Sequence, residues 1–294
     1  MNGIEIFVII VTYNPNLINL SKLINNVFST KTSIIVVDNG SNKDFFFENI
    51  ELIKLNKNYG IAYAQNVGII RAIDLKAEYI FFFDQDSFVD NNFIGDLYEE
   101  FIKIRNLNFN IAAIGPRFFD EKYSFWSPAL VLNKYGFIDK IDISNINSLI
   151  EVSVIISSGS MVSVSALKNI GYMNEKFFID YVDTEWCLRA INNGYKIFLS
   201  ENVKMSHSVG EATIRFLGYT CPVHSGFRRY YRVRNLFLMW KMSYIPKILI
   251  LKLMVTNFFI QILLILLKDK KRDYIKFYLK AIKDGFKEAR HFKP

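Results

Sequence analysis

Residues 6–15 read IFVIIVTYNP, an apolar run that stops at a polar turn and indicates the class of fold. The first six residues are apolar and mostly β-branched, without the alternation typical of a strand that has one face in water. A strand buried on both faces is characteristic of a mostly parallel sheet covered by helices. The polar residues Thr12, Tyr13 and Asn14, followed by Pro15, predict a loop directly after this strand.

Strand-like and helix-like segments alternate after this first strand. Apolar residues show helical spacing at 17–28 and 61–75, whereas 33–37, 51–55 and 79–83 are predicted to be short strands. Such alternation implies right-handed crossovers and an α/β fold with a mostly parallel sheet. Ligands of such sheets bind beyond the carboxyl ends of the strands, which is where the polar loops of this sequence fall.

The composition is that of a folded chain with one large domain, or one domain and an appendage. Of its 294 residues 51% are hydrophobic and 22% charged, which excludes intrinsic disorder. Two cysteines, Cys187 and Cys221, are too few for a disulfide scaffold or a cysteine-rich zinc module. The start of the chain has neither a basic region nor a cleavage site of small residues, so we expect folding in the cytoplasm without a signal peptide.

The net charge of +8 is unevenly distributed. Residues 227–294 contain 17 Lys and Arg against 4 Asp and Glu, a net charge of +13, which leaves −5 on residues 1–226. We therefore predict an α/β domain over 1–226 and a basic helical extension over 227–294. A concentrated positive charge of this kind suits nucleic acid, an anionic membrane or a phosphorylated ligand.

The basic extension contains an apolar segment at 248–267. Its polar positions, Lys252, Thr256, Asn257 and Gln261, form one narrow stripe on a helix. The length could just span a membrane, but the lysine and the two amides favour a helix lying in the membrane plane. Alternatively, the segment packs against the rest of the protein or against a second copy of the chain. The flanking basic residues suit an anionic cytoplasmic leaflet, and they are Lys247, Lys268, Lys270, Lys271 and Arg272.

Several enzyme classes are excluded by missing motifs. The turn after the first strand has no glycine-rich phosphate loop, which argues against a Rossmann dehydrogenase. The sequence also has no Walker motif, and no glycine-rich basic loop near its start of the kind a sugar nucleotidyltransferase needs. A non-catalytic protein that binds membranes or nucleic acid through the basic extension stays open, but it leaves the polar loops at the strand ends unexplained.

A pair of carboxylates, Asp84 and Asp86, follows the strand at 79–83. Residues two apart on an extended segment point to the same face, so both carboxylates can reach one point. Carboxylates held this close repel each other unless a cation lies between them. Oxygen ligands favour Mg²⁺ or Mn²⁺, bound together with waters and substrate phosphates. A solvated strand end is the simpler alternative for an isolated pair.

Taken in order, these motifs resemble family 2 glycosyltransferases, which have the GT-A nucleotide-sugar-binding fold. The matching elements are VTYN at 11–14, VVDNGS at 36–41, NYG at 58–60 with Asn66, and DQD at 84–86. The resemblance implies a Rossmann-like central sheet flanked by helices, with the helical basic extension following it. It also implies a nucleotide-binding set made of Thr12, Tyr13, Asn14, Asp38, Asn39, Asn58, Gly60, Asn66, Asp84 and Gln85.

The resemblance continues through FFIDYVDTEWCLR at 177–189, which is similar to the catalytic segment of the family. It implies that Asp183 is the general base. Val182 stands where the family usually has a first acidic residue, so Asp180 or Glu185 is a possible substitute. The acceptor side is implied to comprise Gly159, in a strand-like SGS stretch, with Asp180, Glu185 and Trp186. Alternatively, Asp183 and Glu185 only stabilise the start of a helix, where carboxylates interact favourably with the helix dipole. For Trp186 the alternative is a position in the core.

Two further elements complete the implied site. His207 is similar to a histidine that joins the metal site in several family members, so the implied ligands are Asp84, Asp86 and His207, although a lone histidine is often structural. The stretch at 224–235 interleaves aromatic residues with arginines, which nucleic-acid-binding proteins also do. A diphosphate is the simpler anion, because arginine matches phosphate oxygens. Its expected ligands are Arg228, Tyr231 and Arg234.

Similar Tyr-Tyr and Arg-Asn elements occur in bacterial rhamnosyltransferases of this family. The resemblance therefore implies inverting, metal-dependent transfer of a sugar, with L-rhamnose from dTDP-L-rhamnose as the first candidate. The implied acceptor is a lipid-linked glycan of surface polysaccharide synthesis, at the cytoplasmic membrane surface. Galactofuranosyltransferases, glucosyltransferases and other transferases share these motifs, so other donor sugars stay open. We expect a peripheral protein on the inner face of the membrane, without a nucleic-acid partner; the oligomeric state is left open.

Overall fold

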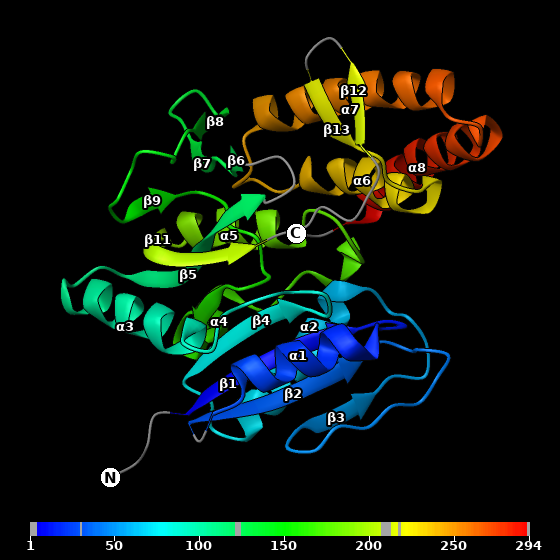
Figure 1. Cartoon of the computed structure of the whole chain (residues 1–294). Helices are drawn as coiled ribbons and strands as arrows, with labels where there is room; N and C mark the ends of the chain where they lie inside the picture. The colour runs from blue at the N-terminus through cyan, green and yellow to red at the C-terminus, as the bar shows by residue number, and fades with distance from the viewer. Residues whose placement is uncertain (1–4, 30, 121–124, 207–212, 217–218, 293–294) are drawn as a thin grey trace. The chain divides into compact units, whose positions relative to one another are not determined.

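The computed structural model describes residues 5–29, 31–120, 125–206, 213–216 and 219–292. The chain forms two compact units (Figure 1). The first, called the sheet unit, comprises Met1–Val131, Asp139–Phe178 and Val182–His207. The second, called the helical unit, comprises Leu132–Ile138, Ile179–Tyr181 and Ser208–Pro294.

The sheet unit is built on a nine-stranded sheet in the order β3-β2-β1-β4-β10-β5-β11-β9, with β6 paired to β5. Its first four strands are parallel, whereas β10 runs antiparallel to both β4 and β5. The predicted mostly parallel sheet is thus confirmed. The strands are β1 (Ile6–Thr12), β2 (Thr32–Asp38), β3 (Glu51–Lys54), β4 (Tyr79–Asp84), β5 (Ile111–Asp120), β6 (Phe125–Trp126), β9 (Ile150–Val152), β10 (Met161–Ser163) and β11 (Lys196–Ser206).

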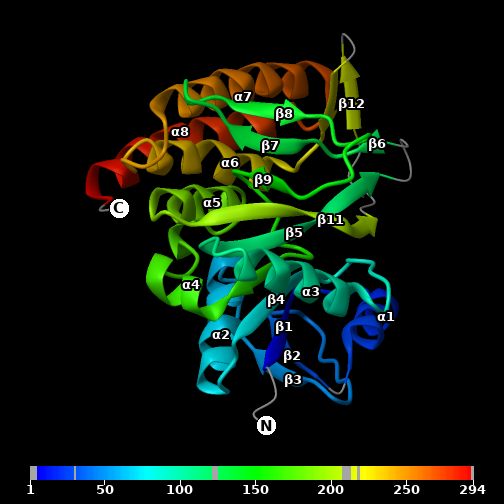
Figure 2. The same ribbon diagram turned by 90° about the vertical axis from the view of Figure 1, so that its left-hand side faces the viewer.

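Helices cover both faces of this sheet (Figure 2), with α1 and α3 on one side and α2 and α4 on the other. The predicted helices at 17–28 and 61–75 correspond to α1 and α2. Asn16 ends the preceding loop by capping α1, accepting hydrogen bonds from the amides of Ile18 and Asn19. The helices are α1 (Leu17–Val27), α2 (Ile61–Asp74), α3 (Phe93–Asn106), α4 (Val164–Ile170) and α5 (Val182–Asn192), with a short 3₁₀ helix, η1, at Glu175–Phe177.

The central strand β1 determines where the polar loops meet. All seven of its residues are buried, and it lies between β2 and β4. In the strand register Thr12 is opposite Asp38, and Val11 is opposite Asp84. The carboxyl ends of three strands therefore lie side by side at one edge of the sheet, as the sequence predicts.

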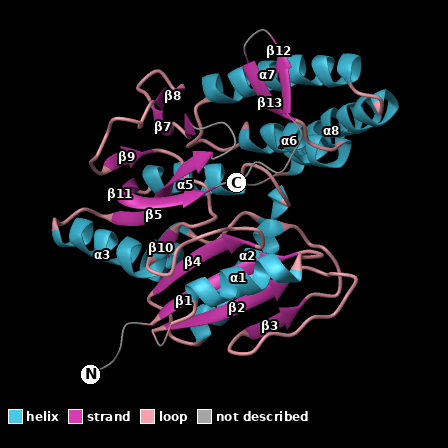
Figure 3. Ribbon diagram, viewed as in Figure 1, coloured by secondary structure: helices cyan, strands magenta, loops and turns pink. Residues whose placement is uncertain are grey.

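The helical unit contains three long helices (Figure 3): α6 (Gly226–Met239), α7 (Lys247–Leu267) and α8 (Lys271–His291). Helix α6 packs closely on α8, where a Cβ at Gly285 would lie 2.4 Å from the Phe237 ring. The predicted helical C-terminal extension is confirmed. Two short strand pairs complete the fold, formed by β7 (Ala129–Leu132) with β8 (Ile138–Ile141) and by β12 (Thr213–Phe216) with the antiparallel β13 (Tyr219–Pro222).

The compact units divide the chain at 207/208, upstream of the predicted domain boundary at 226/227. Among the described residues, β12 and β13 pair with each other and not with the nine-stranded sheet, which explains the earlier division. Two short segments, Leu132–Ile138 and Ile179–Tyr181, also join the helical unit. The distribution of charge along the sequence does not indicate that these two segments belong to the helical unit.

Candidate active site

A buried carboxylate lies at the carboxyl end of β2. Asp38 is 4% exposed, and its Oδ1 accepts a hydrogen bond of 3.0 Å from the Thr12 hydroxyl at the end of β1. The Ser41 hydroxyl also donates to Asp38 Oδ1, and the Ser41 amide donates to Oδ2 at 3.3 Å. Three donors thus fix the carboxylate in place, which stabilises the loop that follows β2.

The loop after β1 is held by the two neighbouring strand ends. Gln85 accepts from the Tyr13 amide at 2.7 Å and donates to the Tyr13 carbonyl at 3.3 Å. Asn14 has a positive φ of 48°, and its amide donates to the Ser41 hydroxyl at 2.7 Å. The Asn42 amide in turn donates to Asn14 Oδ1 at 2.9 Å. The structure therefore brings together Tyr13, Asn14, Asp38 and Gln85.

A second amide network joins the loops after β2 and β3. Asn39 donates to Asn58 Oδ1 at 3.1 Å, and its own Oδ1 accepts from the Tyr59 amide at 2.9 Å. Asn58 Oδ1 also accepts from the amide of Gly60, at 2.9 Å. Gly60 precedes α2, and the next amide, that of Ile61, donates to the Phe178 carbonyl at 2.6 Å. Asn39, Asn58 and Gly60, which come from two of the matching motifs, thus belong to one network.

Gly60 has a backbone conformation that requires glycine. Its φ is +92°, and a Cβ there would lie 2.5 Å from the Phe178 carbonyl oxygen. We therefore expect Gly60→Ala to lower the free energy of unfolding by at least about 1–3 kcal/mol, through backbone strain and this clash. Urea denaturation measures the effect. The control is Gly95→Ala in α3, where a Cβ would meet nothing within 4 Å; equal stability of the two variants would contradict the prediction.

The carboxylates Asp84 and Asp86 do not share one extended strand. Strand β4 ends at Asp84, and the Ser87 amide donates to the Asp84 carbonyl at 3.1 Å, which closes a turn over Gln85 and Asp86. The argument from residues two apart on a strand is therefore wrong, because it assumed that the strand continues. Both carboxylates are exposed, and both belong to one turn at the carboxyl end of β4.

The SGS stretch at 158–160 is a turn, not the expected strand, because strand β10 begins only at Met161. Gly159 has a φ of +76° and donates from its amide to the Phe82 carbonyl at 2.7 Å. Ser158 is 3% exposed, and its hydroxyl accepts from the Asp84 amide at 3.2 Å. The turn therefore supports the backbone at the end of β4 from the side.

Helix α5 carries Asp183, the predicted base, in its first turn. Asp183 is partly exposed, and its Oδ1 accepts from the Thr184 amide at 2.8 Å. Glu185 is 0% exposed and forms an ion pair with Arg189, with N–O distances of 2.8 and 3.1 Å. A buried carboxylate paired in this way is poorly suited to accept a substrate proton, so the geometry favours Asp183 over Glu185.

Two other residues assigned to the site have structural contacts. Trp186 is 2% exposed and donates from its indole to the Gly171 carbonyl at 2.9 Å, which agrees with the core alternative. Asn66 is 5% exposed; its amide donates to the Met173 carbonyl and accepts from the Met173 amide, both at 2.9 Å. Asn66 also donates to Glu175 at 2.8 Å. It therefore fixes the segment that leads to η1, and its binding of a nucleotide stays a prediction.

The predicted diphosphate ligands lie in the helical unit, where Asp180 binds two arginines. Its carboxylate, 5% exposed, accepts from Arg228 at 3.3 Å and from Arg232 at 3.0 Å. Asp180 therefore already has two cationic partners, which disfavours it as a substitute base. Arg234 pairs with Glu288 at 2.9 Å and lies 5.0 Å from the Tyr231 ring centroid. Binding of a diphosphate by Arg228, Tyr231 and Arg234 stays a prediction.

The metal assignment is partly outside the described residues, because His207 is not among them. Among the residues that the structure describes, no group of three or more His, Cys, Asp or Glu side chains is placed to hold a metal ion. Burial raises the pKa of the Cys187 thiol to about 12, so this cysteine is neither a thiolate ligand nor a nucleophile at neutral pH.

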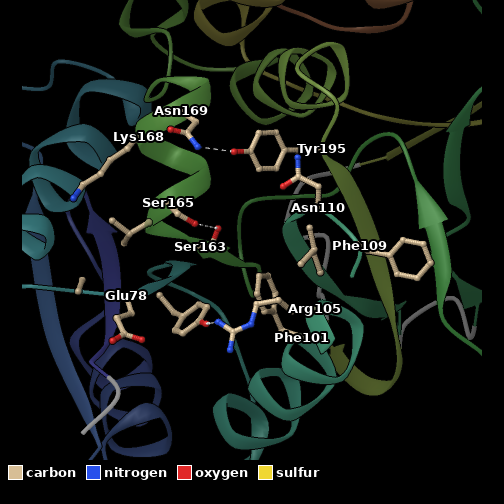
Figure 4. A pocket seen from close by; sticks show the side chains of 14 residues that line it. Glu78, Phe101, Arg105, Phe109, Asn110, Ser163, Ser165, Lys168, Asn169 and Tyr195 are labelled. Carbon is tan, nitrogen blue, oxygen red and sulfur yellow. Dashed lines mark hydrogen bonds between the residues drawn. The ribbon is translucent and has the colours of Figure 1, made fainter. Parts of the chain in front are cut away.

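A hollow of about 550 Å³ lies at the opposite end of β4 (Figure 4). Its lining includes Tyr79, the first residue of β4. Arg105, Lys168 and Tyr195 contribute polar groups to it. In the described part of the chain none of the predicted site residues lines it. Because sheets of this type bind ligands at the carboxyl ends of their strands, we place the active site at the other edge.

Sequence reasoning missed three groups that shape this edge. Ser41 was part of a quoted motif, but its two hydrogen bonds to Asp38 need the folded loop. Ser158, and the Phe178 carbonyl that receives the Ile61 amide, contact residues more than 70 positions away in the chain. The SGS stretch was expected to be strand-like, so the sequence carried no signal for the hydrogen bond of Ser158.

These features define a sheet that presents polar groups at the ends of three parallel strands, followed by a helix with an acidic first turn. Residues 7–171 match the family described as Glycosyl transferase family 2. Because the match covers more than half of the chain, the chain belongs to glycosyl transferase family 2. It is a glycosyltransferase with a GT-A-like fold.

The relatives agree with this assignment. The chain is 40% identical over 288 residues, 96% of both chains, to "dTDP-rhamnosyl transferase RfbF" of Shigella flexneri. It is 25% identical over 247 residues, 80% of this chain and 75% of the other, to "Low-salt glycan biosynthesis hexosyltransferase Agl10" of Haloferax volcanii.

Solved structures share the fold at low sequence identity. A structure of S. aureus TarS 1-349 with UDP-GlcNAc has a TM-score of 0.58 at 16% identity, covering 97% of this chain and 82% of that one. GalNAc-T7, solved with UDP, GalNAc and Mn²⁺, also has a TM-score of 0.58, at 14% identity, covering 83% of this chain and 49% of that one.

Proposed function

We propose that this chain is an inverting rhamnosyltransferase. It transfers L-rhamnose from dTDP-L-rhamnose to a lipid-linked glycan during synthesis of a surface polysaccharide such as O-antigen, capsule or cell-wall glycan. The observation that carries the choice of donor is the 40% identity, over 96% of both chains, to a protein named as a dTDP-rhamnosyl transferase. The proposed roles of individual residues rest on the strand-end geometry.

The nucleoside is proposed to bind across the loops after β1 and β2. Asp38 accepts three hydrogen bonds from Thr12 and Ser41. A carboxylate has about four acceptor positions, so about one is left for a donor group on the nucleotide. Tyr13 is 46% exposed beside this loop and offers an aromatic face for stacking with a base. Asn39, Asn58 and Gly60 hold the adjoining loop in position.

A divalent cation, Mg²⁺ or Mn²⁺, is proposed to bind at the turn after β4. The donor set fits, because Asp84 and Asp86 are exposed carboxylates of one turn, and Mg²⁺ is commonly held by one or two carboxylates together with substrate phosphates. His207 is the proposed third ligand. When bound, the cation supplies charge stabilisation for the leaving diphosphate. The protein's own contribution is the turn itself, whose first residue, Asp84, donates from its amide to the Ser158 hydroxyl.

Asp183 is proposed to accept the proton of the acceptor hydroxyl as that oxygen attacks the anomeric carbon. Attack from the face opposite the departing diphosphate inverts the configuration at this carbon. Asp183 is partly exposed, unlike Glu185, so a substrate hydroxyl can reach it. It stands in the first turn of α5, which fixes the position of its backbone, and a general base has to lie within hydrogen-bond reach of the hydroxyl that it deprotonates.

The acceptor is proposed to be a glycan attached to a lipid carrier, which places the enzyme on the cytoplasmic face of the membrane as a peripheral protein. By length and composition α7 could cross a membrane, although this is weak support by itself. The basic charge of the C-terminal helices is the second supporting observation.

The choice of donor is tested by incubating the purified protein with Mn²⁺ and each of several nucleotide sugars. We expect dTDP-L-rhamnose to release nucleoside diphosphate faster than UDP-glucose, UDP-GlcNAc or UDP-galactofuranose. A difference of about tenfold or more would follow from one lost polar contact in the sugar or base subsite. Faster release from a UDP-sugar would overturn the proposed donor and keep the enzyme class, whereas no release from any donor would contradict the activity itself.

A further inference from the structure

Helix α7 exposes a continuous apolar face. Of the eight exposed large apolar side chains of α7, the six between residues 251 and 266 are 37–65% exposed and, at about 100° per residue, fall within roughly 100° of the helix circumference, whereas Leu267 lies outside this arc. A soluble helix normally turns such a stripe towards the protein core. These six residues, called here the apolar face, are Leu251, Val255, Phe258, Phe259, Ile262 and Leu266.

The opposite side of α7 is buried and carries two amides beside three apolar side chains, which are Leu249, Ile250 and Leu264. Asn257 and Gln261 are 3% and 2% exposed, and both bind the guanidinium of Arg229 on α6. Arg229 donates to Asn257 Oδ1 at 2.7 Å, and Gln261 donates to the Tyr274 carbonyl of α8 at 2.8 Å. The sequence placed four polar residues of α7 on one stripe. Two of them, Lys252 and Thr256, are exposed, whereas the two amides point inward. The amides anchor α7 to the unit and leave its apolar face outward.

Helix α8 adds a positively charged stripe. Its exposed Ile275, Leu279 and Phe286 lie beside cations that occupy roughly 60° of the helix circumference. Two of the three acidic residues of this helix have partners on α6, since Asp284 accepts from the Tyr230 hydroxyl and Glu288 pairs with Arg234, whereas Asp273 is exposed in the first turn. The stripe is therefore not neutralised by these two carboxylates. Its cations, called here the basic stripe, are Arg272, Lys276, Lys283, Lys287 and Arg290.

We propose that the apolar face and the basic stripe form a docking surface for an anionic lipid bilayer, with α7 lying in the membrane plane. The apolar residues insert below the headgroups, and the cations bind anionic headgroups. The inference rests on the proposed function in one respect, because a lipid-linked acceptor requires the enzyme to work at a bilayer. Beyond that function, the inference specifies which surface of the protein contacts the bilayer, how α7 is oriented in it and which lipid charge is preferred.

Charge complementarity favours a bilayer over a second copy of the chain, because two basic stripes would repel each other across an isologous interface. A membrane-spanning α7 is disfavoured by Arg229. Its guanidinium is hydrogen-bonded to Asn257 and Gln261, so α6 with its further arginines would have to enter the hydrocarbon together with α7.

The test is co-sedimentation of the full chain with vesicles of phosphatidylcholine alone, or of phosphatidylcholine mixed equally with phosphatidylglycerol. We expect binding to the mixed vesicles that weakens as salt rises. Phe259→Ser combined with Leu266→Ser should weaken this binding by about tenfold or more, since the variant loses two of the apolar side chains that insert into the bilayer. The matched control is Phe46→Ser, which alters a side chain that is 79% exposed in the sheet unit.

The basic stripe has its own pair of variants. Lys276→Glu with Lys283→Glu should abolish the preference for phosphatidylglycerol, whereas Lys22→Glu, at an exposed position in α1, should leave it unchanged. Release of the bound protein by alkaline carbonate supports an in-plane helix, and retention would overturn it in favour of a span. Binding that survives all these variants, or no binding, overturns the docking surface.

Two further measurements separate this proposal from its alternatives. If the apolar variant turns a dimer into a monomer in light scattering, with vesicle binding unchanged, the apolar face is an interface between copies. Release of nucleoside diphosphate from dTDP-L-rhamnose without vesicles tests the proposed donor alone. A protein that is active on the donor but does not bind vesicles contradicts only the membrane surface, and the reverse result contradicts only the proposed donor.

Discussion

Replacing Asp183 by Asn is expected to lower transfer by about 10²- to 10⁴-fold, the range that general-base help usually contributes. The amide keeps the size of the side chain and its hydrogen bond to the Thr184 amide, but it cannot accept the acceptor's proton. Because the proposed donor site lies in the strand-end loops, affinity for the donor should change little. The measurements are single-turnover transfer rates and isothermal titration of the donor with both proteins.

The control for this variant is Asp96→Asn in α3. Asp96, like Asp183, is acidic and stands in the first turn of a helix, so its replacement removes the same favourable interaction with the helix dipole. Both variants should lose about 0.3–1 kcal/mol of stability, and only Asp183→Asn should lose transfer. If Asp183→Asn retains full turnover, the base is another group.

Removal of divalent cations is expected to have the second largest effect. Chelation with EDTA should lower transfer by about 10²- to 10³-fold, because charge stabilisation of the leaving diphosphate contributes several kcal/mol. Mn²⁺ or Mg²⁺ added in excess should restore the rate. Asp86→Asn should raise the concentration of Mn²⁺ needed for half-maximal activity by about tenfold or more, because one of the two proposed carboxylate ligands loses its charge.

Asp90→Asn serves as the control, since Asp90 is an exposed carboxylate four residues further along the same loop. It should leave the Mn²⁺ requirement unchanged. Full activity of the chelated enzyme would contradict the metal site. An equal effect of the two substitutions would mean that general negative charge, and not a ligand at Asp86, sets the metal requirement.

The central sheet was predictable because its signal is local. An apolar run such as that of β1 can be satisfied only by burial on both faces, and strands of this kind have to be parallel neighbours. Asp38 and Asp84 then follow directly, since each ends a strand beside β1. The motif residues met at one edge because parallel strands all end there.

The contacts that were not predictable depend on where a segment turns. The predicted strand ended at 83 and β4 ends at Asp84, so Asp86 would share an extended segment with Asp84 only if β4 continued for two more residues. Trp186 and Glu185 are helical residues whose burial depends on what packs against α5. The two inward amides of α7 were grouped with exposed Lys252, because spacing identifies one side of a helix but not the neighbour it faces.

The hydrogen bond from the Ile61 amide to the Phe178 carbonyl has a consequence for protein engineering. Together with the Asn66 contacts to Met173, it ties the start of α2 to a segment more than 100 residues later in the chain. In a chimera whose crossover point lies between these two segments, the N-terminal segment comes from one relative and the later segment from another. Such a chimera would combine contact partners that did not come from the same protein. Grafting a new sugar preference should therefore succeed only when residues 58–66 and 172–178 are transplanted together.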